Sequence, residues 1–137
     1  MLNPKPSRPQ DGALLIMPWI VRADLQSQPD ALFAFGDNEG RYGLGGQARE
    51  MRGEPNAVGI ATLKAPGVFW SDDEADRQCA VIDADMAPLF AALADGRTVI
   101  WPADGVGSGL ADLQNRSPKT WAHLQARVAE LKTQGGV

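Results

Sequence analysis

Two glycine-rich segments hold most of the residues whose types and spacing point to chemistry. The first runs from Gly36 to Ala48 and the second from Pro102 to Leu110, and each follows an apolar, strand-like run. Glycine lets the backbone approach a ligand closely, and successive N–H groups in such a segment can converge on an anion. A helix-like stretch follows each segment, and a helix N-terminus adds unpaired donors. The sequence therefore predicts a site for a phosphorylated ligand, with a nucleotide as the best fit.

Better-known phosphate-binding and catalytic motifs do not explain these segments. Gly43, Gly45 and Ala48 have the spacing of the dinucleotide fingerprint, but six residues separate Gly36 from Gly43, whereas that motif begins directly after its strand. The chain has neither the Gly-x-x-x-x-Gly-Lys-Ser/Thr pattern of P-loop NTPases nor a Gly-x-Ser-x-Gly elbow. A classical nucleotide-binding motif is therefore not the basis of the prediction.

Metal chemistry is not expected either. The chain has one cysteine, Cys79, and one histidine, His123, so no cluster of thiolates or imidazoles can form. We expect Cys79 to be a buried structural thiol and His123 to be a packed or half-exposed helix residue. We expect no metal and no cofactor.

Composition and charge limit the class of protein. The 137 residues are 44% hydrophobic and 22% charged, with a formal net charge of −4, which fits one ordinary globular domain. An acidic chain without a basic run is not expected to bind nucleic-acid backbones non-specifically. No apolar run approaches the ~20 residues that span a membrane. We expect no membrane partner, a cytoplasmic location and a polar N-terminal arm over residues 1–12.

Apolar periodicity divides the remaining chain into alternating strands and helices. Short apolar runs predict strands at 13–17, 30–35, 56–61 and 97–101. A short helix or turn is predicted at 18–28, and a strand or packed loop at 66–72. Longer helices are predicted at 45–52, 72–95 and 117–134. Asp72 or Asp73 is the expected cap of the second, and Ser117 is the expected cap of the third. Pro88 should kink or divide the middle one.

This alternation predicts a three-layer α/β domain over residues 13–134, with a mainly parallel sheet. Ligands of such sheets bind at the carboxyl ends of the strands. Both glycine-rich segments leave strand ends of that kind, so we expect them to line one crevice although about 60 residues separate them.

The order of these parts resembles the macro domain, the ADP-ribose-binding module. The corresponding pieces are 23–25, the strand 30–35, the polar turn 36–38, the glycine-rich stretch 43–46, and the later strand and loop 98–109. The greatest similarity is to the branch that contains the terminal ADP-ribose protein glycohydrolase, on the patterns at 41–48, 61–64 and 106–114. The chain also resembles small uncharacterised phage and bacterial domains with Gly-Asp-Asn and Gly-Gly-Gln-Ala signatures.

The resemblance implies an α/β/α macro-like fold with a mainly parallel or mixed sheet, and a ligand such as ADP-ribose or a related NAD-derived nucleotide. An ADP-ribosylated macromolecule is the wider partner that it implies. Asp24 would accept a hydrogen bond from an adenine amino group, and Asp37 and Asn38 would hold a ribose. Lys64 and Asp112 would carry out the hydrolysis of an ADP-ribosyl linkage.

The two implied catalytic residues are each displaced by one position from the family pattern. Leu63 stands between Thr62 and Lys64, and Ala111 stands between Leu110 and Asp112. In a strand, a shift of one residue reverses the direction of the side chain. Binding is therefore better supported by the sequence than hydrolysis.

The predicted ligand-binding residues combine the two glycine-rich segments with the positions that the resemblance adds. They are Asp24, Asp37, Asn38, Arg41, Gly43, Gly45, Gly46, Gln47, Asp104, Gly105, Val106, Gly107, Ser108, Gly109 and Leu110. Each position also has a possible structural role. The glycines, Asp37 and Asn38 could form turns, Asp24 could lie in the first turn of a helix, and Arg41 could form an ion pair. Phe69 or Trp70 is either a stacking platform for a base or part of the core.

Three functions remain open at this point. The chain is an enzyme that removes ADP-ribose, a binding module for ADP-ribose or a related nucleotide, or an interaction domain that has lost its ligand. The two intact glycine-rich segments favour the binding module.

Overall fold

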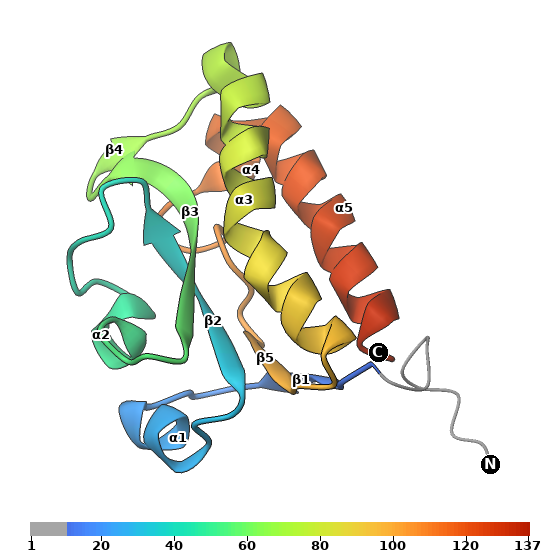
Figure 1. The fold of residues 1–137 in the computed structure, drawn as a ribbon. Helices are drawn as coiled ribbons and strands as arrows, with labels where there is room; N and C mark the ends of the chain where they lie inside the picture. The colour runs from blue at the N-terminus through green and yellow to red at the C-terminus, as the bar shows by residue number, and fades with distance from the viewer. Residues whose placement is uncertain (1–10) are drawn as a thin grey trace.

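A mostly parallel sheet forms the middle layer of the computed structural model, which describes residues 11–137 (Figure 1). Its five strands within those residues are β1 (Leu14–Met17), β2 (Leu32–Asn38), β3 (Ala57–Ala65), β4 (Val68–Phe69) and β5 (Val99–Pro102). The strand order is β1-β5-β2-β3-β4, and every neighbouring pair is parallel except β3 and β4. The predicted three-layer α/β class is confirmed.

Helices cover both faces of this sheet (Figure 1). They are α1 (Arg22–Ser27), α2 (Ala48–Met51), α3 (Ala75–Ala94), α4 (Leu113–Arg116) and α5 (Pro118–Gln134), with a 3₁₀ turn, η1 (Asp72–Glu74), before α3. The two long helices α3 and α5 pack on one face, and α1 and α2 lie on the other (Figure 1).

The alternation of side chains in β2 explains the two layers of core. Phe33 and Phe35 are buried against Leu25 of α1 and Met51 of α2. Ala34, between them, joins the larger cluster that α3 and α5 cover. Successive residues of a strand point to opposite faces, so one apolar run supplies both cores.

Two strands extend further than predicted. β2 continues through Gly36 and Asp37 to Asn38, and β3 continues to Ala65. Asp37 stays in register with Ala61, and Asn38 with Leu63 after an irregularity. Polar residues remain in the ladder here because their side chains find protein partners, which the sequence does not reveal.

The helix predicted at 45–52 is only one turn long, Ala48–Met51. Gly46 has a φ of +55°, which is incompatible with a right-handed helix and leaves the preceding residues as loop. The prediction was wrong about the helix start because a glycine-rich run does not specify which glycine takes the left-handed conformation.

Pro88 does not divide α3, which excludes one of the two expected outcomes, a kink or a break. The helix is continuous from Ala75 to Ala94 with Pro88 inside it. Met86 and Leu89 on either side are fully buried in the main core. Tertiary packing on both sides therefore offsets the loss of one backbone hydrogen bond.

The predicted caps at the two long helices act differently from expectation. Asp72 accepts a hydrogen bond from the backbone N–H of Lys119 at 3.0 Å, so it caps α5 instead of the helix that follows it. Ser117 occupies the N-cap position of α5, but its hydroxyl bonds with Gln78 and Thr120. The segment 66–72, predicted as a strand or a packed loop, contains the short strand β4, and its last residue, Asp72, begins η1.

The predicted N-terminal arm lies mostly outside the described residues. Its last two positions, Asp11 and Gly12, are buried, and the Gly12 N–H donates to the Leu93 carbonyl at 2.7 Å. Residues 11 and 12 therefore belong to the folded body. Within residues 11–137, none of the helices has both the length and the apolar character needed to cross a bilayer.

Candidate ligand-binding site

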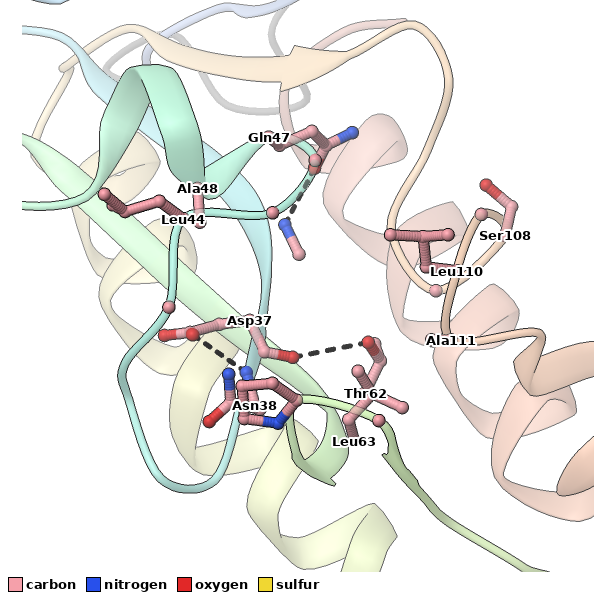
Figure 2. A pocket seen from close by; sticks show the side chains of 18 of the residues that line it. Asp37, Asn38, Leu44, Gln47, Ala48, Thr62, Leu63, Ser108, Leu110 and Ala111 are labelled. Carbon is pink, nitrogen blue, oxygen red and sulfur yellow. Dashed lines mark hydrogen bonds between the residues drawn. The ribbon is translucent and has the colours of Figure 1, made fainter.

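A cavity of about 730 Å³ opens at the carboxyl ends of β2, β3 and β5. Both glycine-rich segments line it, which confirms that they share one crevice (Figure 2). From the first segment and α2 come Gly36, Asp37, Asn38, Tyr42, Gly43, Leu44, Gly45, Gly46, Gln47, Ala48 and Arg52. The remaining walls are Thr62, Leu63, Pro66, Gly67, Phe69, Asp104, Gly105, Gly107, Ser108, Gly109, Leu110 and Ala111.

Gln47 ties the two segments together. Its Oε1 accepts a hydrogen bond from the Gly36 N–H at 2.7 Å, and its Nε2 donates to the Gly105 carbonyl at 2.9 Å. One side chain thereby links the end of β2 to the loop after β5. Gln47 lines the cavity as predicted, and its bonds also set the spacing between the two loops.

Backbone N–H groups are the main unused donors around the cavity. Within residues 11–137, the N–H groups of 42–47 and 107–111 form no hydrogen bond with another protein group. Gly43, Gly46, Gly105 and Gly107 have φ between +55° and +95°, a region that only glycine enters without strain. Consecutive free N–H groups in such turns favour an anion.

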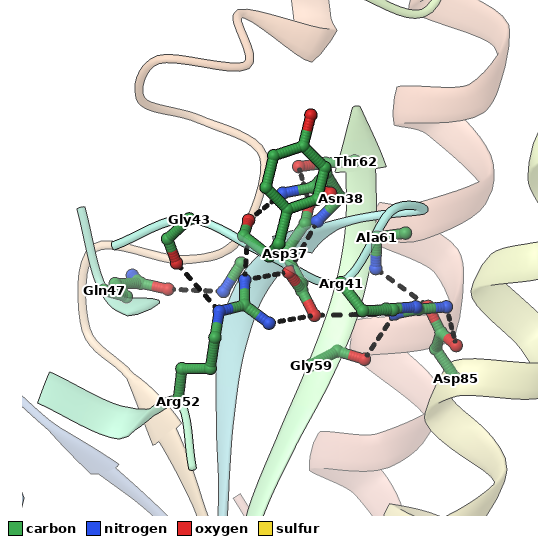
Figure 3. A network of polar contacts seen from close by, with 12 residues as sticks. Asp37, Asn38, Arg41, Gly43, Gln47, Arg52, Gly59, Ala61, Thr62 and Asp85 are labelled. Atoms are coloured by element: carbon green, nitrogen blue, oxygen red, sulfur yellow. Dashed lines mark hydrogen bonds and ion pairs between the residues drawn. The ribbon is translucent and has the colours of Figure 1, made fainter. Parts of the chain in front are cut away.

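Asp37 and Asn38 line the cavity, and the Asp37 carboxylate and the Asn38 Nδ2 group bond to other protein groups, while the buried Oδ1 of Asn38 has no partner among the described residues (Figure 3). The Asp37 carboxylate is buried and accepts two hydrogen bonds from the guanidinium of Arg52. Asn38 donates from Nδ2 to the Tyr42 carbonyl at 2.8 Å. The structure thus gives both residues a role in holding the loop, the alternative to ribose binding that the sequence left open.

Arg52 is a lining residue that sequence reasoning missed. Besides its ion pair with Asp37, its Nε donates to the Gly43 carbonyl at 2.8 Å and Nη2 donates to the Tyr42 carbonyl at 3.3 Å. It is the one Lys or Arg among the described residues that line the cavity. No local pattern marks it, because its acidic partner lies 15 positions earlier in the chain.

The electrostatics of the cavity follow from this pairing. Asp37 neutralises the Arg52 guanidinium, so no unpaired cationic side chain faces a ligand among the described residues. An anionic ligand would depend on backbone dipoles instead. Arg41 does not add a charge to the wall, since it lies outside it and pairs with Asp85 at 2.7 Å and with Asp37 at 3.7 Å.

The two implied catalytic residues do not line the cavity. Lys64 is exposed, and its Nζ lies 3.6 Å from Glu74. Asp112 takes the N-cap position of α4 with a φ of +48°, and its carboxylate bonds with Asn115 and pairs with Arg116. The intervening residues Leu63 and Ala111 line the cavity in their place, as a shift of one residue would produce.

Two further predicted ligand residues lie elsewhere. The Asp24 carboxylate accepts a hydrogen bond from the Val21 N–H at 2.9 Å at the start of α1, and Asp24 is not a lining residue. Val106 is buried in the main core. The remaining predicted positions, Gly43, Gly45, Gly46, Gln47, Asp104, Gly105, Gly107, Ser108, Gly109 and Leu110, all line the cavity.

Trp70, His123 and Cys79 contribute nothing to the cavity wall, and Cys79 is only partly buried, not buried as expected. Trp70 is buried, and its Nε1 donates to Glu39 at 2.7 Å, so it is unable to stack on a ligand. His123 Nε2 lies 2.7 Å from Asp83, and neither residue lines the cavity. Burial raises the pKa of the Cys79 thiol, and Asp83 and Asp76 raise it further. Within residues 11–137, no group of three or more His, Cys, Asp or Glu side chains could hold a metal ion.

Comparison with known proteins identifies a family for this chain. No curated protein matches the sequence, and no solved structure matches it. The model of a family of unknown function, DUF7831, matches residues 15–127, a range that includes the whole cavity wall. The chain therefore belongs to this family of unknown function, DUF7831.

Proposed function

We propose that this protein binds ADP-ribose or a related NAD-derived nucleotide in the cavity between its two glycine-rich loops. One observation carries the proposal: two runs of free backbone N–H groups, at 42–47 and 107–111, line the same cavity. Peptide N–H groups are good ligands for phosphate oxygens, and they need no cationic side chain. The resemblance to the macro domain supports the same class of ligand.

The size and chemistry of the cavity also favour a nucleotide. A volume of about 730 Å³ lies in the range of pockets for small organic ligands. Thr62, Asp104 and Ser108 add polar groups to the wall, and Leu44, Phe69 and Leu110 add apolar surface. A ligand with phosphate, hydroxyl and ring groups would use all three kinds of surface.

The proposal is for binding, without hydrolysis. Lys64 and Asp112, the two residues that would carry out the chemistry, lie outside the cavity wall. Incubation with an ADP-ribosylated protein tests the enzymatic alternative. Release of ADP-ribose by the wild-type protein, with loss of that release in Lys64→Ala and Asp112→Ala, would support the enzymatic alternative.

Calorimetric titration with ADP-ribose, NAD and AMP tests the binding. Gly45 and Gly109 suit blocking substitutions, because an added Cβ at either meets no atom within 4 Å and neither has a left-handed φ. Gly45→Val and Gly109→Val should weaken binding by about tenfold or more by filling the cavity, with little change in stability. Ala126→Val, at an exposed position of α5 outside the cavity, is the control.

The result that contradicts the proposal is the absence of binding to all three nucleotides by the intact protein. That result would favour an interaction domain that has lost its ligand. Binding that survives both glycine substitutions would place the ligand elsewhere on the molecule. A cytoplasmic location is part of the proposal, and cell fractionation tests it.

A further inference from the structure

The mouth of the cavity carries apolar side chains that the fold does not bury. Tyr42 is 56% exposed, Leu44 64%, Phe69 38% and Leu110 80%, and all four line the cavity. We call these four residues the apolar rim. Leu44 comes from the first glycine-rich loop and Leu110 from the second (Figure 2).

The fold itself does not account for this exposure. Leu44 and Leu110 belong to neither of the buried core clusters. Exposed leucine side chains leave apolar surface in water, and a group of them around a cavity marks a binding surface. Phe69 is fixed in place, since the guanidinium of Arg116 from α4 lies 3.5 Å from the centroid of its ring.

Two kinds of surface therefore meet in one cavity. Free N–H groups lie in the same loops as the exposed leucines, with Leu44 inside the run 42–47 and Leu110 inside the run 107–111. A ligand that uses both would combine phosphate with an apolar part, and the base of a nucleotide is such a part. The cavity, at about 730 Å³, has room for both.

We propose that the apolar rim binds the nucleobase of the ligand, with Leu44 and Leu110 as the principal contacts. This inference rests on the proposed nucleotide-binding function and assigns the base to a position in the cavity. It also replaces Asp24, which lies outside the cavity, as the determinant of base binding. The base is recognised through apolar contact with its ring, while the loops hold the phosphate.

The test compares two ligands that differ only in the base, AMP and ribose 5-phosphate. The wild-type protein should bind AMP more tightly than ribose 5-phosphate. Leu44→Ser and Leu110→Ser should each weaken AMP binding by roughly fivefold to tenfold and leave ribose 5-phosphate binding unchanged. Both positions are exposed, so thermal melts should show folded variants.

Leu15→Ser is the matched control. Leu15 is a 47% exposed leucine on β1 that does not line the cavity, so this variant should bind both ligands as the wild type does. Equal affinity of the wild type for the two ligands would overturn the inference, as would rim variants that bind AMP normally or lose both ligands equally. In those cases the proposed function would stand. A wild-type protein that binds no phosphorylated ligand would instead overturn the proposed function, and this inference with it.

Discussion

The lack of a side chain at Gly59 leaves space for the Asp37 carboxylate at the cavity wall. A Cβ built on Gly59 would lie 2.4 Å from Oδ2 of Asp37 and 2.9 Å from its Cβ. The same carboxylate is the partner of Arg52, which in turn bonds to the carbonyls of Tyr42 and Gly43 (Figure 3). The absence of one side chain on β3 thus permits the network that holds the first glycine-rich loop.

Gly59→Ala should therefore lower the free energy of unfolding by about 1–3 kcal/mol, because Asp37 must move away from the new methyl group. Urea denaturation measures this change. Gly109→Ala is the control, since its added methyl group meets no atom within 4 Å. Equal stability of the two variants would show that Asp37 relaxes at little cost.

Glu39 gives the stability of the protein a dependence on acid pH. It accepts hydrogen bonds from Arg77 at 2.5 Å and from Trp70 at 2.7 Å. The bond from Arg77 is the main cause of a lowered pKa, which burial partly opposes and the bond from Trp70 reinforces. A carboxyl whose folded pKa is lowered stabilises the fold above its unfolded pKa, about 4.3, and loses this contribution as the pH falls further.

Glu39→Gln should accordingly reduce stability at pH 7 and make it less sensitive to pH between about 5 and 3. Denaturation in urea at several pH values measures both effects. Glu130→Gln, which removes an exposed carboxylate paired with Arg127 on α5, is the control and should change the pH profile little. A profile for Glu39→Gln parallel to that of the wild type would contradict the prediction.

At the scale of elements, the contact between η1 and α5 depends on Asp72. Its carboxylate accepts from the Lys119 N–H at the first turn of α5. The cap comes from a segment 47 positions earlier in the chain, so it fixes the start of α3 against the start of α5. Two helices that cover the same face of the sheet are thereby joined at one end.

Asp72→Ala should lower stability by about 1 kcal/mol, the usual loss for a helix cap. Asp73→Ala is a matched control, because Asp73 is an exposed neighbour whose side chain has no hydrogen bond or ion pair to other described residues. Thermal melts of the two variants provide the comparison. Equal melting temperatures would mean that solvent replaces the cap without loss.

At the scale of the whole molecule, the cavity exists because two distant loops are held at a fixed separation. Gln47 makes that connection through its two ends, with Gly36 at one and Gly105 at the other. A glutamate at this position would keep the acceptor for Gly36 but lose the donor to Gly105. The two bonds can therefore be tested separately.

Gln47→Ala and Gln47→Glu should both weaken nucleotide binding, because each releases the loop after β5 from the end of β2. Only Gln47→Ala should also speed hydrogen exchange of the Gly36 amide, since Gln47→Glu preserves its acceptor. Calorimetry and exchange measured by NMR report the two effects. Fast exchange at Gly36 in both variants would contradict the expectation that Gln47→Glu keeps the bond to Gly36. Gln125→Ala, at an exposed position of α5, is the control.

Much of the architecture could be predicted because it depends on local patterns. Short apolar runs located β1 and β5 to within two residues, and apolar spacing located α5. The extension of β2 and the short α2 could not be predicted, since they depend on the pairing of Asp37 with Arg52 and on the left-handed φ of Gly46. The residues of β2 and α2 contain no local pattern that predicts where these two elements end or begin.

The local sequence was enough to predict that a glycine-rich loop follows each of two strands, because apolar runs and glycine content can be seen within short stretches of the chain. The pairing of β2 with β5, which brings the two loops together, is a tertiary property. Which side chains reach the cavity depends on the tertiary arrangement. It turned Lys64 and Asp112 away, brought Leu63 and Ala111 to the wall, and neutralised Arg52 with Asp37. The physical reason is that side-chain direction reverses with each residue of a strand, as at Leu63 and Lys64, that Asp112 takes the N-cap position of α4, and that ion pairs join residues far apart in the chain.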